Sequence, residues 1–149
     1  FHVSSCYRRP VIRVFRTIDI AGSSLTAHGL CMDVIASNLA NVNTTRTETG
    51  GSYARKTPVF AEILATEEKR QCGGGVRVVD IAEDTQPPRL VYQPDHPDAD
   101  ERGYVAYPNV NVVREMADMM TASRSYEANL AVADGVKNMW NGALDILRG

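Results

Sequence analysis

The chain has little of what chemistry or a membrane anchor would need. Among its 149 residues are three histidines, three cysteines and only 7% aromatic residues. Cys6, Cys31 and Cys72 lie far apart, and no CxxC pair or Cys/His cluster suggests a zinc site. No apolar run approaches about 18 residues, so no transmembrane helix is expected.

No excess of either charge sign is present. Sixteen Lys and Arg face eighteen Asp and Glu, which gives a net charge of -2. A dedicated nucleic-acid binder usually carries a basic face, so this balance argues against nucleic acid as a partner. The length favours one domain with a real core, which must come mainly from aliphatic and Met side chains.

Catalytic motifs are also missing. Of the three histidines, His28 falls on a helical apolar stripe, while His2 and His96 lie near the terminus and in a Pro-rich loop. The chain has no G-x-S-x-G turn, and Gly73-Gly74-Gly75 lacks the Lys-Ser/Thr of a phosphate loop. We therefore predict no enzyme, no catalytic residue, no cofactor and no small-molecule substrate.

One acidic loop invites comparison with a calcium site. Asp98, Asp100 and Gly103 fit positions one, three and six of an EF-hand loop. Arg102 at position five repels a cation, and Asn109 replaces the bidentate Glu at position twelve. A turn before a strand at Tyr104 is the better interpretation, and no metal site is predicted.

Two segments at opposite ends of the chain carry a helical pattern of apolar residues. The first has spacings of three and four at Ile18, Ala21, Leu25, His28, Met32, Ile35, Leu39 and Val42. The second runs from Val112 to about Leu147, through Met116, Met119, Ser123, Tyr126, Leu130, Ala133, Lys137, Trp140 and Leu144. Asn109 or Asn111 can cap its start, and Glu115 suits the helix dipole there.

The segment between the two helical patterns differs from them in composition. Gly and Pro punctuate it, and short β-favouring runs occur at 58–60, 76–81, 90–92 and 104–107. We predict an α+β fold, with long terminal helices paired as an antiparallel coiled-coil hairpin and a small, mainly antiparallel β insertion between them. A long helix with an apolar stripe is not stable alone in water, so the stripes must be covered by each other or by other subunits.

Polar residues on these helices carry a family resemblance. The segment 37–44 (Ser-Asn-Leu-Ala-Asn-Val-Asn-Thr) resembles the N-terminal signature of bacterial flagellar rod and hook proteins. The segments 103–113, 115–116 and 122–130 are closer still, and 87–92 also matches. Together they resemble the proximal-rod branch of this axial protein family, over about residues 15–147.

The resemblance implies a structural subunit of the flagellar basal-body rod, in the cell envelope or periplasm, which transmits torque. It also implies export through the flagellar type III apparatus without a cleaved signal peptide. Expected partners are the chain itself, other rod proteins, the export apparatus and the basal-body ring at the rod base. A coiled-coil adaptor or secretion chaperone is the alternative, and a calcium-binding or enzymatic domain fits less well.

We expect four segments and one extended assembly interface. Residues 1–14 are expected to be a disordered or non-native extension, 15–45 the N-terminal helix, 46–108 an outward-facing β-rich insertion and 109–149 the C-terminal helix. The expected interface consists of Leu25, Met32, Ile35, Ser37, Asn38, Leu39, Asn41, Asn43, Thr44, Met116, Met119, Ser123, Arg124, Tyr126, Glu127, Asn129, Leu130, Trp140 and Leu144.

Overall fold

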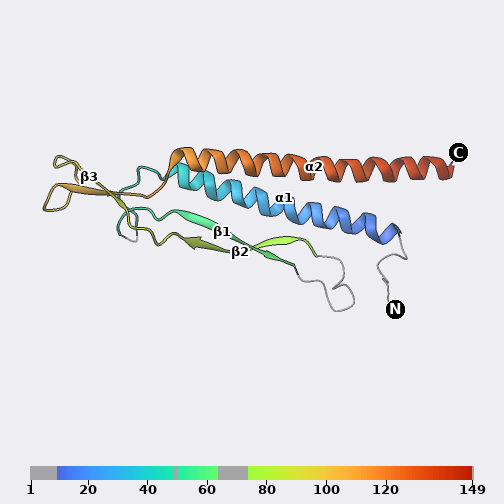
Figure 1. The fold of residues 1–149 in the computed structure, drawn as a ribbon, viewed down its shortest axis with the longest axis horizontal. Coiled ribbons are helices and arrows are strands. Elements are labelled where there is room, and N and C mark those ends of the chain that lie inside the picture. Colours follow the sequence, from blue (N-terminus) through green and yellow to red (C-terminus); the bar gives the residue numbers. More distant parts are fainter. Residues whose placement is uncertain (1–9, 49, 64–73, 149) are drawn as a thin grey trace. The chain divides into compact units, whose positions relative to one another are not determined.

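The computed structural model describes residues 10–48, 50–63 and 74–148, and it confirms the α+β class (Figure 1). Helix α1 spans Pro10–Ala40 and helix α2 spans Val112–Arg148. Between them lie β1 (Lys56–Glu62), β2 (Val76–Glu83), β3 (Arg89–Tyr92) and β4 (Tyr104–Tyr107). Neither helix has a stretch that is long and apolar enough to cross a bilayer within the described ranges.

Both helices have identifiable ends. α2 begins after Asn111, whose Oδ1 accepts a hydrogen bond from the Arg114 N–H at 3.2 Å, as expected for a helix N-cap. α1 ends at Ala40, and the Asn41 side chain donates to the Ser37 carbonyl at 2.9 Å. α1 begins at Pro10, upstream of the predicted start at residue 15, because Pro suits the first turn of a helix. The rest of the predicted extension, residues 1–9, lies outside the described residues.

The strands form two separate two-stranded sheets. In the first, Asp84 N donates to Arg55 O near one end and Ile63 N to Gly75 O near the other, which is the reversed order of an antiparallel pair. In the second, β3 and β4 are antiparallel, with Val91 opposite Val105 and Tyr92 opposite Tyr104. The predicted β runs are therefore confirmed, with small changes at their ends.

The loop between β3 and β4 is a turn held by its own acidic residue. The Asp100 carboxylate accepts hydrogen bonds from the N–H groups of Arg102 at 2.9 Å and Tyr104 at 2.8 Å. Gly103 has φ +81, and a Cβ there would lie 2.9 Å from Cε2 of Tyr92, so glycine is required. The side chain considered as a calcium ligand thus shapes the turn before β4.

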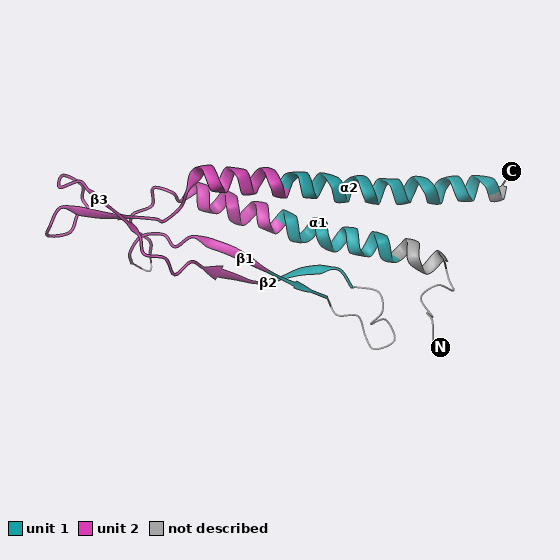
Figure 2. Cartoon of the chain, viewed as in Figure 1, with its two compact units in different colours: residues 1–29, 60–79, 123–149 teal, residues 30–59, 80–122 magenta. Residues whose placement is uncertain are grey.

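Contacts divide the chain into two compact units (Figure 2). Unit 1 consists of Phe1–Gly29, Phe60–Val79 and Ser123–Gly149, and unit 2 of Leu30–Val59 and Asp80–Ala122. Each unit therefore contains part of both helices and part of the first sheet. Buried apolar residues of unit 1 include Ala21, Ala27 and Val136; those of unit 2 are Val34, Ile35, Val105 and Ala122.

In unit 1, the start of β2 lies directly against α1. Val76 N donates to the Ser23 hydroxyl at 3.2 Å, and that hydroxyl donates to the Ile20 carbonyl at 2.8 Å. Gly75 has φ +102, and a Cβ there would collide with the Ser23 hydroxyl. Only glycine therefore allows the strand to approach the helix this closely.

Gly75→Ala is expected to lower the free energy of unfolding by about 2 kcal/mol, because it adds left-handed backbone strain and displaces the Ser23 hydroxyl. Denaturant unfolding followed by circular dichroism measures the change. Gly29→Ala is the control, since a Cβ at that helical position meets nothing within 4 Å. It should stabilise the chain by up to about 1 kcal/mol. Equal stability of Gly75→Ala and wild type would contradict the argument.

Candidate assembly interface

A buried polar cluster connects three segments of unit 2. We call it the Glu115 cluster, and it consists of Asn38 at the end of α1, Tyr53 and Arg55 before and at the entry of β1, and Glu115 in the first turns of α2. Glu115 is 0% exposed and Asn38 1% exposed. Burying such groups is costly unless each is paired, so their partners define the site.

Arg55 neutralises the buried carboxylate of Glu115. Its Nε donates to Glu115 Oε1 at 2.7 Å, and its Nη2 lies 2.7 Å from the same oxygen. Its Nη2 also lies 3.7 Å from Asp118, and its Nη1 donates to the Thr57 hydroxyl at 2.8 Å. The guanidinium therefore connects the entry of β1 to two successive turns of α2.

Asn38 supplies the other half of the cluster. Its Nδ2 donates to Glu115 Oε2 at 3.0 Å and to the Lys56 carbonyl at 2.8 Å. Its Oδ1 accepts from the Tyr53 hydroxyl at 3.0 Å and from Lys56 N at 2.9 Å. Both amide protons and the carbonyl are thus used within the chain, so the Asn38 side chain is satisfied inside the subunit.

The Cys31 thiol lies within electrostatic range of the carboxylates around this cluster. Burial raises the pKa of its thiol, and the negative charges of Asp118 and Glu115 raise that pKa further. A higher thiol pKa means less thiolate at a given pH, and the thiolate is the reactive form.

Asp118→Asn is expected to lower the thiol pKa and speed alkylation of Cys31 at mildly alkaline pH, because one of the two raising charges is removed. Mass spectrometry of a chain with Cys6→Ser and Cys72→Ser measures the rate. Asp95→Asn, a charge change in the exposed β3–β4 loop, should leave the rate unaltered. No acceleration in Asp118→Asn would contradict the assignment of that charge.

The residues expected at the assembly interface fall into three groups by exposure. Ile35 and Asn38 are buried. Asn43, Met116, Arg124, Glu127, Leu130 and Trp140 are exposed. The half-buried ones are Leu25, Met32, Ser37, Leu39, Asn41, Thr44, Met119, Ser123, Tyr126, Asn129 and Leu144.

The inward face of α2 differs in part from the predicted stripe. Met119, Tyr126 and Ala133 are half-buried as expected, but the second row consists of Glu115, Ala122, Asn129 and Val136. Each of these lies one position before a predicted residue: Met116, Ser123, Leu130 and Lys137. In unit 2, the pairing of Glu115 with Arg55 accounts for the inward position of Glu115. Met116 and Leu130 therefore stay exposed in the single chain.

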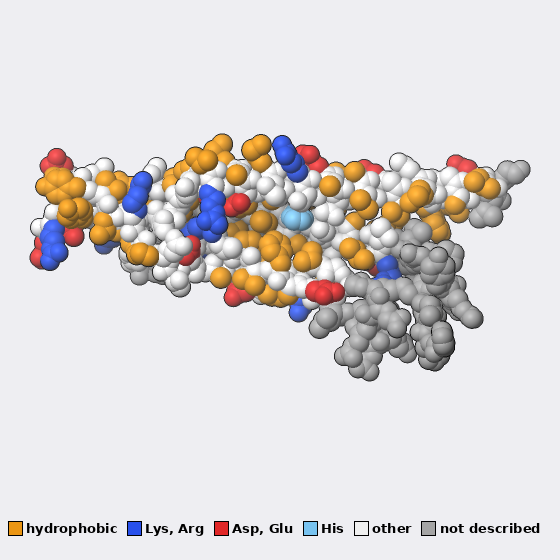
Figure 3. All heavy atoms as spheres, in the orientation of Figure 1, with side chains coloured by type: hydrophobic (Ala, Val, Ile, Leu, Met, Phe, Trp, Pro, Cys, Tyr) orange, Lys and Arg blue, Asp and Glu red, His pale blue; other side chains and the backbone are white. Residues whose placement is uncertain are grey.

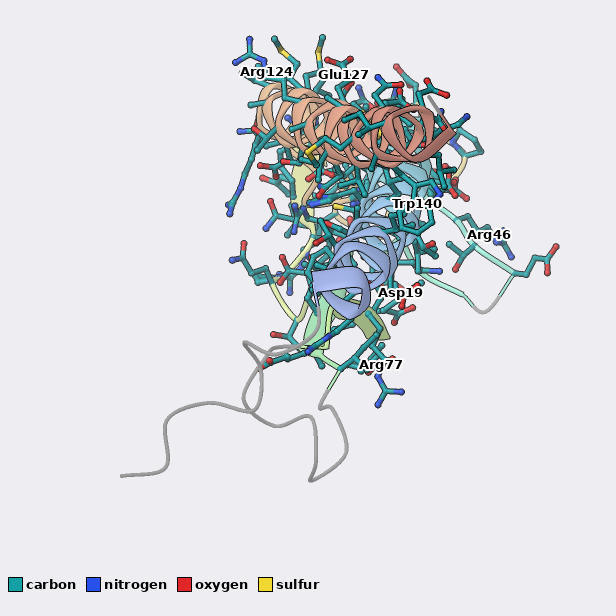
Figure 4. The ribbon with its side chains drawn as sticks, turned by 90° about the vertical axis from the view of Figure 1, so that its right-hand side faces the viewer. Asp19, Arg46, Arg77, Arg124, Glu127 and Trp140 are labelled. Atoms are coloured by element: carbon teal, nitrogen blue, oxygen red, sulfur yellow. The ribbon has the colours of Figure 1, made fainter. Side chains whose placement is uncertain are left out.

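Large apolar side chains remain on the surface of both helices. In unit 2 the first turns of α2 expose Val113, Met116 and Met120 on one side, where hydrophobic atoms gather in Figure 3. In unit 1 α2 exposes Leu130, Val132, Met139 and Ile146. Figure 4 shows Arg124 and Glu127 on the side of α2 away from α1, and Trp140 extending on the side of α1. Exposed apolar patches of this kind mark protein–protein contact sites.

Unit 2 has a hollow of about 490 Å³ between the end of α1 and the approach to α2; Val42, Arg89, Val110 and Asn111 are among its lining residues. The described residues that line it include no histidine, cysteine or carboxylate. In residues 10–48, 50–63 and 74–148, no three His, Cys, Asp or Glu side chains are grouped to hold a metal ion.

These features describe a structural class: a subunit with two long helices, apolar surfaces on both, and a polar cluster fixing their junction. Family models agree and divide between the two ends of the chain. Residues 18–46 match the flagella basal body rod protein model, and residues 101–146 match the C-terminal model of flagellar basal body rod FlgEFG proteins. The chain is thus related to structural proteins of the flagellar rod.

Curated relatives define the family more narrowly, and all three described here are flagellar basal-body rod proteins FlgC. The protein from Borreliella burgdorferi is 43% identical over 150 residues, covering 91% of this chain and 99% of the relative. That from Escherichia coli O6:H1 is 47% identical over 81% of this chain and 88% of the relative. That from Bacillus subtilis is 39% identical over 89% and 97%. The chain belongs to the FlgC family, and it is a structural subunit of the flagellar basal-body rod, not an enzyme.

The Glu115 cluster is the feature that sequence reasoning missed. Asn38 was expected at an interface between subunits, and Glu115 only as a favourable charge near a helix start. Arg55 precedes Glu115 by 60 residues, and no spacing rule connects them. The sequence offered one signal for a buried carboxylate. Glu115 shares a helix face with the small residue Ala122, seven residues later.

Proposed function

We propose that this rod subunit is exported through the flagellar type III apparatus and adds to the proximal rod, where it transmits torque across the periplasm. Membership of the FlgC family supports the rod assignment, and the family resemblance supports the finer placement. Assembly with other flagellar rod proteins follows from the family. Contacts with the export apparatus and with the ring at the rod base belong to the proposal.

The observation that carries the proposal is the apolar surface left on α1 and α2. Ile18, Ile20 and Leu30 on α1 and nine large apolar residues on α2 are exposed in the single chain. Full burial of one such side chain contributes about 1.5–3 kcal/mol. A few such side chains in each contact between subunits are enough to favour a packed assembly over free subunits, because the free energies of burying them add.

The proposed contacts with neighbours are the exposed and half-buried members of the expected interface. Met116 and Leu130 supply apolar area, while Arg124 and Glu127 supply charged groups on the same helix. Ile35 and Asn38 contribute from within the subunit, since both are buried in unit 2. We also propose that the two helices pair along their length as an antiparallel coiled coil in the assembled rod.

Antibody labelling of purified hook–basal bodies tests the proposal. Antibody against this chain should label the rod close to the basal rings, and particles from a strain lacking the chain should show no label. Purified particles without label, with the chain found only in the cytoplasmic fraction of the cells, would instead support a secretion chaperone. Label on the distal rod alone would contradict the proximal placement and leave the rod assignment intact.

A further inference from the structure

The Glu115 cluster contains the two buried polar side chains of unit 2 among the described residues, Asn38 and the charged Glu115. It joins residue 38 to residue 115, which are 77 positions apart, through a direct hydrogen bond between side chains. The residues of unit 2 in α1 and α2 run in opposite directions (Figure 2). This hydrogen bond therefore defines which turn of α1 lies level with which turn of α2.

Apolar packing in unit 2 is too uniform to make the same choice. The buried apolar residues on its helices are Val34, Ile35 and Ala122, and all of them are aliphatic. Sliding one helix by a turn replaces aliphatic contacts by other aliphatic contacts, which costs less than leaving a buried charge unpaired. The same slide leaves the Glu115 carboxylate without Asn38 and Arg55, and a buried charge without partners is strongly unfavourable.

We propose that Asn38, Arg55 and Glu115 are positioning residues that set the register between the end of α1 and the start of α2. The cluster selects one register by making the others leave a charge unpaired, as single polar residues do in helical assemblies. Tyr53 and Lys56 extend the choice to β1, because both hydrogen-bond Asn38 Oδ1. One fixed register gives every copy of the subunit the same apolar surface.

Positions further along the two helices report the register. Cys31 lies seven residues back from Asn38, and Met119 and Ala122 lie four and seven residues on from Glu115, so the antiparallel stretches bring Cys31 to this part of α2. Cys31 is half-buried and Ala122 buried, both in unit 2. Met119, also half-buried, lies on the same face of α2, three residues or about 4.5 Å along its axis.

Disulfide formation in the full chain tests the register. With Cys6→Ser and Cys72→Ser as background, a cysteine is introduced by Ala122→Cys or by Met119→Cys. Under mild oxidation, Cys31 should pair with one of the two positions about tenfold faster than with the other, because disulfides tolerate little displacement. Adding Asn38→Ala or Arg55→Met should bring the two rates within about twofold, because the native register then pairs Glu115 little better than a shifted register does.

A matched control separates register from general stability. Val105→Ala removes buried volume from β4 of unit 2 and leaves the cluster intact, so the wild-type preference between positions 122 and 119 should persist. Arg55→Lys keeps the positive charge beside Glu115. It should fold even if Asn38→Ala or Arg55→Met does not, and it should retain part of the preference between the two positions. The proposal is overturned if the cluster variants keep the full preference, or if Val105→Ala loses it as they do.

Discussion

Arg55→Ala is expected to lower the free energy of unfolding of the isolated chain by about 3–5 kcal/mol. The Glu115 carboxylate is 0% exposed, and Arg55 supplies both nitrogens that lie 2.7 Å from its Oε1. Truncation leaves that oxygen buried without a counter-charge, and Asn38 remains on the other oxygen only. Urea unfolding of the purified chain, followed by circular dichroism, measures the loss.

The comparison variants separate charge pairing from lost packing. Arg114→Ala removes an exposed arginine from the same helix start and should change the free energy of unfolding by less than about 0.5 kcal/mol. Arg55→Met combined with Glu115→Gln removes both charges and keeps an acceptor for Asn38. It should be more stable than Arg55→Ala, because no buried charge is left unpaired. An Arg55→Ala chain within about 1 kcal/mol of wild type would show that the ion pair contributes little.

The elements of the fold were predictable because their signals are local. The start of α2 follows from Asn111, whose side chain caps Arg114 N–H as the sequence suggested. The β3–β4 hairpin follows from two β-favouring runs around a turn rich in Asp and Gly. Each signal lies within a few residues of the structure it specifies, so neighbouring side chains decide it.

The inward face of α2 was less predictable, because several of its residues are polar and a search for apolar spacing passes over them. The row Glu115, Ala122, Asn129, Val136 contains a charge, an amide and a small residue, so it scores as less apolar than Met116, Ser123, Leu130, Lys137. Yet Ala122 permits close approach, and Glu115 is matched by Arg55 from a segment 60 residues away. Long-range pairing of this kind leaves no periodic trace in one sequence. The pairing of the two helices along their full length stays a prediction.

This difference changes how the exposed apolar residues are understood. Met116 and Leu130 are 56% and 45% exposed, so they contribute less to the fold of the single chain than the buried residues of α2 do. Large apolar side chains that the fold does not use are free to pack against neighbouring subunits. Substitutions there should therefore separate assembly from folding.

Leu130→Asp is expected to abolish swimming while leaving the fold of the chain intact. Leu130 is 45% exposed, so a carboxylate at this position stays in contact with water in the free subunit. In the rod, the same change removes about 2–3 kcal/mol of apolar burial per subunit and adds the cost of desolvating a charge. We expect a chain that is exported but absent from purified basal bodies, measured by immunoblot and by spreading in soft agar.

Val132→Asp provides the matched comparison, because Val132 is 47% exposed on the same helix but lies on a different side of it and is not a member of the expected interface. It should reduce swimming less than Leu130→Asp, with both purified chains unfolding within about 0.5 kcal/mol of wild type. Normal swimming of the Leu130→Asp strain would refute a role for Leu130 in assembly. Loss of the folded state in that variant would show instead that Leu130 supports the subunit itself, because a change confined to an interface leaves the free chain intact.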